Sequence, residues 1–362
     1  MTRRPYPAHR YSSNASREKC DQLDPPVVSS VGELIAAVPA LLGFVPERSM
    51  VLVCMRSGLS GTTVEVCMRQ DLPPRLDSPE LAEVIHRCGE VCEREGFDAV
   101  IAVLITGSRF VMPYEVLADA LAGTLLPLGI DLLGVHHVAH LTAGTTWTSL
   151  GGDSRAGTLE EPSASQVAAS RVMSGRQIRA SRNELTELLA LAPAAECARF
   201  EVSRDSVELE CEVKAPAELL YDTVEDLISV NETGDLDHLT AARTMFAIGT
   251  TAVRDALLAL ASTDLGPVTE QVWVHLTTRV MGPDRAHPAT MLAVWSYLRG
   301  EGPLAGVALE IALDADPSYR LALLLDTALQ NGVRPTVVRE LVLSARELAN
   351  DFGVDLPPDV ER

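Results

Sequence analysis

The sequence predicts two folded parts, an α/β domain with a mixed sheet and a leading hairpin, then a mostly helical domain. A chain of 362 residues is longer than one hydrophobic core usually supports, so two domains are expected. Apolar residues form 47% of the chain but aromatic residues only 4%, and this composition favours helices that pack closely through small side chains. Strand patterns gather before residue 155, whereas helical patterns dominate after it.

The expected boundaries follow composition. Residues 1–26 are polar and punctuated by proline, which is typical of a disordered leader. We expect the α/β domain over 27–155, and a turn-rich connection with a first helix over 156–180. The mostly helical domain then covers 181–352, and a short tail covers 353–362.

The α/β domain begins with a helix and a hairpin. Ser30 followed by Glu33 is a capping-box pattern that opens a helix. The apolar segments SMVLVCMR and VEVCMRQDL flank the turn SGLSGT and predict two paired strands. A helix starting at Pro79, the strand DAVIAVLITG, a helix over 113–128 and the strand DLLGVHHVAHL complete the order of a mixed sheet covered by helices.

Helical patterns dominate the second domain. They fall near residues 165–177, from Ser181, and over 216–230, 236–262 and 267–281. One segment differs: VELECEV (207–213) alternates strictly, which predicts a half-buried strand paired with the preceding RFEVS.

The segment WSYLRGEGPLAGVALEIALDADP (295–317) predicts a helical hairpin. Ala305 and Ala308 are small enough for two helices to approach closely, and Asp316 with Pro317 is typical of the start of the next helix. The spacing resembles a tetratricopeptide hairpin, but such an array needs about three copies and one is found. A local hairpin packed on its neighbours is therefore favoured over a repeat scaffold with a peptide groove.

Charge and cysteine usage limit the class of protein. The formal net charge of −20 disfavours nucleic-acid binding and suggests a cationic partner. The start of the chain lacks the apolar core of a signal peptide, and the longest uncharged stretch, 132–152, carries three His and four Gly, so we expect no membrane span. Seven scattered cysteines without a Cys-x-x-Cys pair favour free thiols in the cytoplasm.

A metal or cofactor is not expected. His136 and His140 share one face of an extended strand, but His137 points the opposite way, so only two could converge on a metal. Cys88 and Cys92 lie four apart on one helix face, and the pattern favours buried thiols. Cys54 and Cys67 are expected to be cross-strand neighbours in the hairpin, again as buried thiols.

The candidate ligand-binding residues lie at strand ends. Arg69 and Asp71 project to one side of a strand end, and Arg48 with Ser49 starts the partner strand. The simpler alternative is a salt bridge that fixes the exit of the hairpin. Ser108 and Arg109 belong to the turn TGSR, where backbone N–H groups could hold an anion, although no P-loop or dinucleotide fingerprint is present.

Several segments together resemble a known family. The motifs LLGFVPERS, RQDLP, VRDALL and GEGPLAGVALEIALDADP, in this order, are similar to an actinobacterial family known only as a domain of unknown function. The resemblance covers roughly residues 27–340, and it implies no activity.

The sequence thus favours a cytoplasmic, non-catalytic protein-interaction or regulatory protein, because it holds no complete catalytic set. Whether it is an enzyme stays open. The alternative is a small-ligand binder or an enzyme that uses a strand-end cleft around Arg69 and Asp71.

Overall fold

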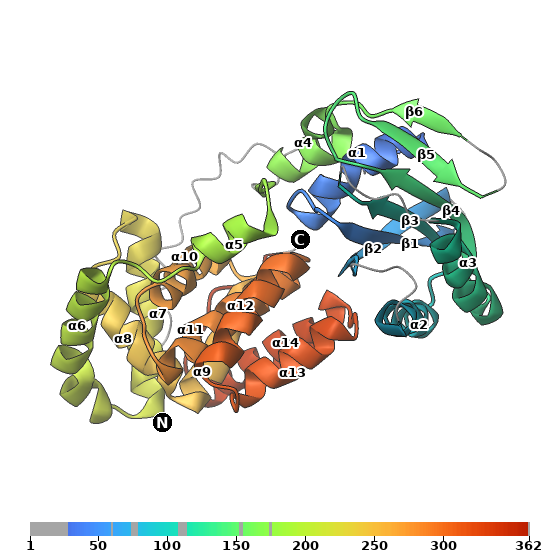
Figure 1. Ribbon diagram of the computed structural model, residues 1–362. Helices are drawn as coiled ribbons and strands as arrows, with labels where there is room; N and C mark the ends of the chain where they lie inside the picture. The colour runs from blue at the N-terminus through green and yellow to red at the C-terminus, as the bar shows by residue number, and fades with distance from the viewer. Residues whose placement is uncertain are drawn as a thin grey trace. The chain divides into compact units, whose positions relative to one another are not determined.

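A computed structural model describes residues 28–58, 61–73, 79–107, 114–151, 155–173 and 176–360. The described chain divides into two compact units, which meet in sequence between Glu184 and Leu185. The first unit is a mixed sheet with helices and the second is helical (Figure 1), which confirms the predicted fold class.

The sheet of the first unit has six strands in the order β2-β1-β3-β4-β5-β6. β3 and β4 are parallel, and the other neighbouring pairs are antiparallel. The strands are β1 (Ser49–Gly58), β2 (Gly61–Asp71), β3 (Ala99–Ile105), β4 (Asp131–Val138), β5 (Thr146–Leu150) and β6 (Ala156–Thr158). The helices are α1 (Val31–Leu42), α2 (Pro79–Glu95), α3 (Tyr114–Leu125), α4 (Gln166–Met173) and the first turn of α5 (Arg182–Leu188).

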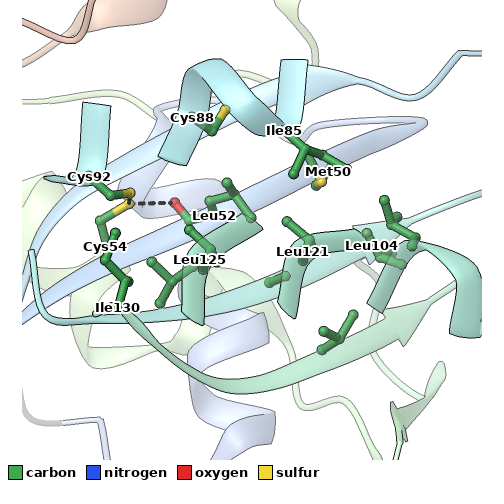
Figure 2. Close-up of a cluster of buried hydrophobic side chains, with 14 of the residues drawn as sticks. Met50, Leu52, Cys54, Ile85, Cys88, Cys92, Leu104, Leu121, Leu125 and Ile130 are labelled. Atoms are coloured by element: carbon green, nitrogen blue, oxygen red, sulfur yellow. Dashed lines mark hydrogen bonds between the residues drawn. The ribbon is translucent and has the colours of Figure 1, made fainter. Parts of the chain in front are cut away.

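Helices cover both faces of this sheet. α2 and α3 bury one face, where alternate residues of β1 and β3 meet Leu, Ile and Cys side chains of the helices (Figure 2). On the other face, the Trp147 ring of β5 comes within 3.3 Å of where a Cβ on Gly32 of α1 would lie. The core therefore lies in two layers, and the strands between them are apolar on both sides, as expected for a covered sheet.

The predicted start of α1 is confirmed. The backbone N–H of Glu33 donates to Ser30 Oγ at 3.2 Å, and the Glu33 carboxylate accepts from the N–H of Ser29 at 2.7 Å. The helix ends at Gly43, which has a φ of +86° and whose N–H donates to the Pro39 carbonyl. Both ends thus satisfy backbone groups that the helix itself leaves unpaired.

Two features of the sheet differ from expectation. β5 and β6 extend it beyond the two strands that follow the hairpin in the prediction. Cys54 and Cys67 are not opposite each other, because the register pairs Cys54 with Val66 and Val53 with Cys67. Since successive side chains point to opposite faces, this shift of one residue places the two thiols on opposite sides of the sheet.

The second unit is built around one buried helix, α11 (Ala286–Leu298). Every residue of α11 from Pro288 to Tyr297 is buried. The helices of this unit are α6 (Ala194–Glu212), α7 (Pro216–Thr233), α8 (His238–Gly249), α9 (Thr251–Leu257), α10 (Gly266–Thr277), α12 (Gly302–Ala315), α13 (Arg320–Gln330) and α14 (Pro335–Asp351). Short 3-10 helices lie at Leu126–Leu128 and Pro162–Ala164 in the first unit, and at Leu258–Ser262 and Pro283–Arg285 in the second.

Among the described residues, no single helix is both long and apolar enough to cross a membrane. One pair, α8 with the segment Thr251–Ser262, is long and apolar enough only when its two parts are joined, and it bends by 107°.

The predicted strand at 207–213 is wrong, because this segment is the end of helix α6. Val207 and Cys211 are buried, whereas Leu209 and Val213 are 76% and 79% exposed. The alternation therefore arises from two apolar stripes on opposite sides of one helix. The buried stripe, with Phe200 seven residues before Val207, has the helical period and decides the structure.

The predicted helical hairpin is present, but the turn that follows its second helix differs from the prediction. α12 presents Ala305 and Ala308, both fully buried, and α11 and α12 pack together. Asp316 does not cap the next helix. It accepts from the N–H and hydroxyl of Ser318, at 2.9 and 2.7 Å, so that Asp316-Pro317-Ser318 forms a turn and α13 begins at Arg320.

We predict that Ala305→Leu destabilises the protein, because the larger side chain must enter a closely packed helix contact. The expected cost is about 1–3 kcal/mol of unfolding free energy, seen as a melting temperature lower by several degrees. Asp314→Leu adds the same side chain at an exposed position of the same helix and should change the melting temperature little. Equal effects of the two substitutions would contradict close packing at Ala305.

Candidate functional site

Four strand ends meet at one edge of the sheet. β3 and β4 run parallel, so their carboxyl ends lie at the same edge, where Ile105 pairs with Val138. β1 is antiparallel to β3, and its first residue, Ser49, pairs with Ile105 on one side and with Asp71, the last residue of β2, on the other. The strand-end residues that the sequence singles out therefore gather at this edge, where α/β proteins commonly bind ligands.

Ser49, Arg69 and Asp71 form one connected group at this edge. The Arg69 Nε donates to the Ser49 hydroxyl oxygen at 2.9 Å, and its Nη2 pairs with the Asp71 carboxylate. The Ser49 hydroxyl, itself buried, donates to the Glu47 carbonyl at 2.7 Å. The guanidinium also lies over the Phe44 ring, 5.7 Å from its centre. Arg69 is thus fixed by its neighbours, with 19% of its side chain exposed.

Arg48 adds strained backbone to the same edge. Its φ of +41° is the only positive value among the described residues other than glycine. The Arg48 carbonyl accepts from the Leu72 N–H at 2.8 Å, and its Cγ lies 3.9 Å from where a Cβ on Gly107 would be. Such strain occurs preferentially at functional positions. Ser108 and Arg109, the other predicted ligand residues, lie outside the described residues.

The two strand histidines point to opposite faces, as predicted, and each has a hydrogen-bonding partner. His137 Nε2 lies 2.9 Å from the Thr106 hydroxyl, and His136 Nδ1 lies 3.0 Å from the Ser149 hydroxyl. Burial lowers the pKa of both rings, which favours neutral imidazoles at pH 7. His140 lies beyond the end of β4, so it does not share a strand face with His136. Within the described ranges, no three His, Cys, Asp or Glu side chains gather closely enough to hold a metal.

Free thiols are confirmed for the six cysteines that the structure describes. Burial raises the pKa of Cys67 and of Cys88 to about 12, so these thiols stay protonated and weakly nucleophilic at neutral pH. Cys88 and Cys92 lie on the buried face of α2, as predicted.

A second polar network lies inside the helical unit. Arg254 of α9 pairs with the adjacent Asp255 and donates through Nη1 to the Tyr319 hydroxyl at 2.8 Å. That hydroxyl lies 3.0 Å from Nδ1 of His287 on α11. The ion pair of Arg254 is therefore with its neighbour in sequence, Asp255. The hydrogen bonds through the Tyr319 hydroxyl connect α9, the residue before α13, and α11 in one polar network.

The exposed side of α6 carries an apolar stripe that the sequence pattern did not single out. Val202, Leu209 and Val213 are 68%, 76% and 79% exposed. They are seven and four residues apart, so they lie within about 40° of one another around the helix axis. Ala195 and Ala198, two turns and one turn before Val202, and Ser206, between Val202 and Leu209, are also exposed and continue this line. We call these six residues the α6 stripe.

Charges beside the α6 stripe are asymmetric. Asp205, Glu208 and Glu212 are exposed along one flank. On the other flank, Glu210 is neutralised by Lys214, whose Nζ lies 2.8 Å from its carboxylate. Exposed carboxylates therefore border the apolar surface on one side only. The sequence does contain a signal for this surface, because residues 202, 209 and 213 have the spacing of one helix face. The strict alternation over 207–213 suggested a strand instead and therefore concealed that signal.

His275 is an incompletely satisfied buried group in the helical unit. Its ring lies on α10, and Nε2 has no hydrogen-bonding partner in the described part of the chain. Burial, with the positive charge of Arg279, lowers its pKa to about 4. The ring is therefore held in its neutral form.

The fold and the strand-end group define a two-unit protein, an α/β unit followed by a helical unit. The chain belongs to the family described as a domain of unknown function (DUF4192), whose model matches residues 32–336. No curated protein matches the chain, and no solved structure does.

We predict that acid destabilises the folded chain in part through His275. Its folded pKa lies below the usual 6.5, so between pH 6.5 and about 4 the unfolded chain binds a proton that the folded chain does not. Stability should therefore fall as pH drops through this window. His275→Gln should flatten the decline in urea unfolding at pH 7, 6 and 5. An unchanged slope in His275→Gln would refute this origin.

Proposed function

We propose that this chain is a cytoplasmic, non-catalytic protein-interaction protein that binds a partner through the α6 stripe. The observation that carries the proposal is the exposure of Val202, Leu209 and Val213 in one line along α6 and its C-cap residue, Val213. Scattered exposed apolar residues are ordinary on protein surfaces, but an aligned set marks a contact surface. Helices recognise such surfaces through apolar side chains at the same spacing.

The partner that fits best is an amphipathic helix with basic residues beside its apolar face. Asp205, Glu208 and Glu212 would face Lys or Arg on that helix, and the net charge of −20 would attract it from a distance. A second copy fits less well in the antiparallel arrangement, because the same acidic flank of each α6 would then face the other. Like charges in that position are destabilising.

Apolar contact and charge would contribute differently to this binding. Burying a Leu or Val side chain contributes about 1.5–3 kcal/mol before the entropic costs of association. The exposed carboxylates would add less to the affinity, because water and salt screen them. The stripe would therefore set how tightly a partner binds, and the acidic flank would set which partner is preferred.

We predict that a synthetic helical peptide with a Leu stripe flanked by Lys binds the full chain, while the same stripe flanked by Glu binds weakly. Fluorescence anisotropy of labelled peptides measures both affinities. Leu209→Ser with Val213→Ser should weaken binding of the Lys peptide by about tenfold or more. Glu208→Lys with Glu212→Lys should reverse the preference between the two peptides.

The matched control is Leu324→Ser, at a 66% exposed leucine of α13 in the same unit. It should bind the Lys peptide as the unaltered chain does, and all variants should keep their melting temperature because the altered side chains are exposed. Equal loss in the control, or equal binding of both peptides, would refute the proposal. Concentration-dependent dimerisation abolished by the Leu209 and Val213 changes would assign the stripe to a second copy instead.

A second candidate is a small-ligand site at the strand-end edge, used for binding alone or for catalysis. What favours it is the geometry of Arg69. Its Nε and Nη2 are held by Ser49 and Asp71, while Nη1 has no acceptor among the described residues. A fixed guanidinium beside the strained Arg48 would suit an anion. A carboxylate or phosphate group is the expected ligand class.

We predict that Asp71→Asn strengthens binding of inorganic phosphate to the full chain, because it removes the carboxylate that competes for Arg69. Asp71 is 78% exposed, so folding should be unaffected. Arg69→Met should abolish the binding, whereas Arg87→Met, at an exposed arginine of α2, should preserve it. Isothermal titration calorimetry measures each case. If neither substitution changes the affinity for phosphate, the proposed site is wrong and the Arg69–Asp71 salt bridge has only a structural role.

A further inference from the structure

Two cysteines far apart in sequence meet in the core of the α/β unit. Cys54 of β1 and Cys92 of α2 have their sulfur atoms 3.7 Å apart, and neither side chain is exposed to solvent. Figure 2 shows the two sulfurs close together, near the labelled side chains of Leu52, Leu125 and Ile130. A disulfide has a sulfur–sulfur length of about 2.05 Å, so a small rearrangement would bring the two atoms to bonding distance.

The surroundings distinguish these two sulfurs from the neighbouring thiols. Cys88 lies one turn before Cys92 on the same face of α2, and Figure 2 shows its sulfur apart from the pair. Cys67 pairs with Val53 in the sheet register, which places it on the opposite face from Cys54. Cys54 and Cys92 are therefore the pair that the fold brings together, and the other two serve as natural controls.

The hydrogen bond between the two sulfurs shifts the pKa values of the two thiols in opposite directions. It raises the pKa of Cys54, with burial adding in the same direction, and it lowers the pKa of Cys92 although burial opposes this. Cys54 therefore keeps its proton more readily than Cys92 does, and its thiol also lies 3.8 Å from the Leu52 carbonyl oxygen, to which it donates. This arrangement favours the thiolate on Cys92, which is the reactive form in thiol oxidation.

We propose that Cys54 and Cys92 form an oxidant-sensitive thiol pair that a peroxide converts reversibly to an intramolecular disulfide. The Cys92 thiolate attacks one peroxide oxygen, the O–O bond breaks, and the leaving hydroxide takes a proton to become water. The Cys54 sulfur then attacks the sulfenic sulfur of Cys92, losing its own proton as a second water leaves. The two thiols lose two electrons in total, and hydrogen peroxide gains them.

Burial governs how this reaction proceeds. Because both sulfurs are buried in the core between the sheet and its helices, peroxide reaches them only when this core opens locally, so oxidation should be slow in the native protein. The same burial protects the sulfenic acid from further peroxide, since the partner thiol is already in place. The disulfide would then tie β1 to α2 across the 38 positions that separate the two cysteines.

The test is carried out on the full chain. Hydrogen peroxide is added to the folded, reduced protein, free thiols are alkylated, and disulfide-linked peptides are mapped by mass spectrometry. We expect two of the seven thiols to be lost, a Cys54–Cys92 linkage, complete recovery with dithiothreitol, and a higher melting temperature for the oxidised form. Cys88→Ser and Cys67→Ser should still form this linkage, whereas Cys54→Ala and Cys92→Ala should not.

Mapping on the unaltered chain decides the question even where a cysteine variant folds poorly. A linkage through Cys88 or Cys67, or irreversible sulfinic acid at Cys92 without a disulfide, would overturn the proposal. So would formation of the Cys54–Cys92 linkage only after unfolding in urea, because the pairing would then not come from the native core.

Discussion

The burial of α11 is the constraint on which the helical unit depends. A helix that is apolar on every side cannot face water, so neighbours must surround it. α8, α10, α12, α13 and α14 all pack against it. Its Trp295 ring meets Trp273 of α10 edge to face, with centres 5.6 Å apart, and its indole N–H donates to the Thr269 hydroxyl at 2.8 Å. The small residues of α12 let that helix approach closely, which makes the hairpin part of this core.

The helical unit contains polar side chains in its interior and apolar side chains on its surface, and the two have different effects on stability. In the interior of the helical unit, Arg254 forms a hydrogen-bonded network with Tyr319 and His287. Such networks fix the packing of elements, because breaking one member leaves another buried without a partner. The α6 stripe is the reverse case, since its apolar side chains contribute nothing to the folded unit that carries them. Their exposure is the observation on which the proposed contact surface rests.

Features that depend on local chemistry could be predicted from the sequence. The cap at Ser30, the hairpin and the gathering of Ser49, Arg69 and Asp71 follow from short-range patterns and from how strands end. Features set by distant packing could not. Alternation over 207–213 fits a strand and also fits a helix with two apolar sides, and only the partner of the buried side decides between them. The meeting of Cys54 with Cys92 likewise depends on how α2 lies across β1, which no local pattern reports.

The edge strand β6, which is the last strand in the order of the sheet, has a consequence for solubility. β6 is three residues long, and the Trp147 ring lies 2.9 Å from where a Cβ on Gly157 would be, so only glycine fits beneath it. An edge strand exposes unpaired backbone groups that can recruit another chain. A strand this short offers few of them, and its one glycine is covered by an indole. This end of the sheet is therefore poorly suited to template the growth of aggregates, even though the central strand β3 is entirely apolar.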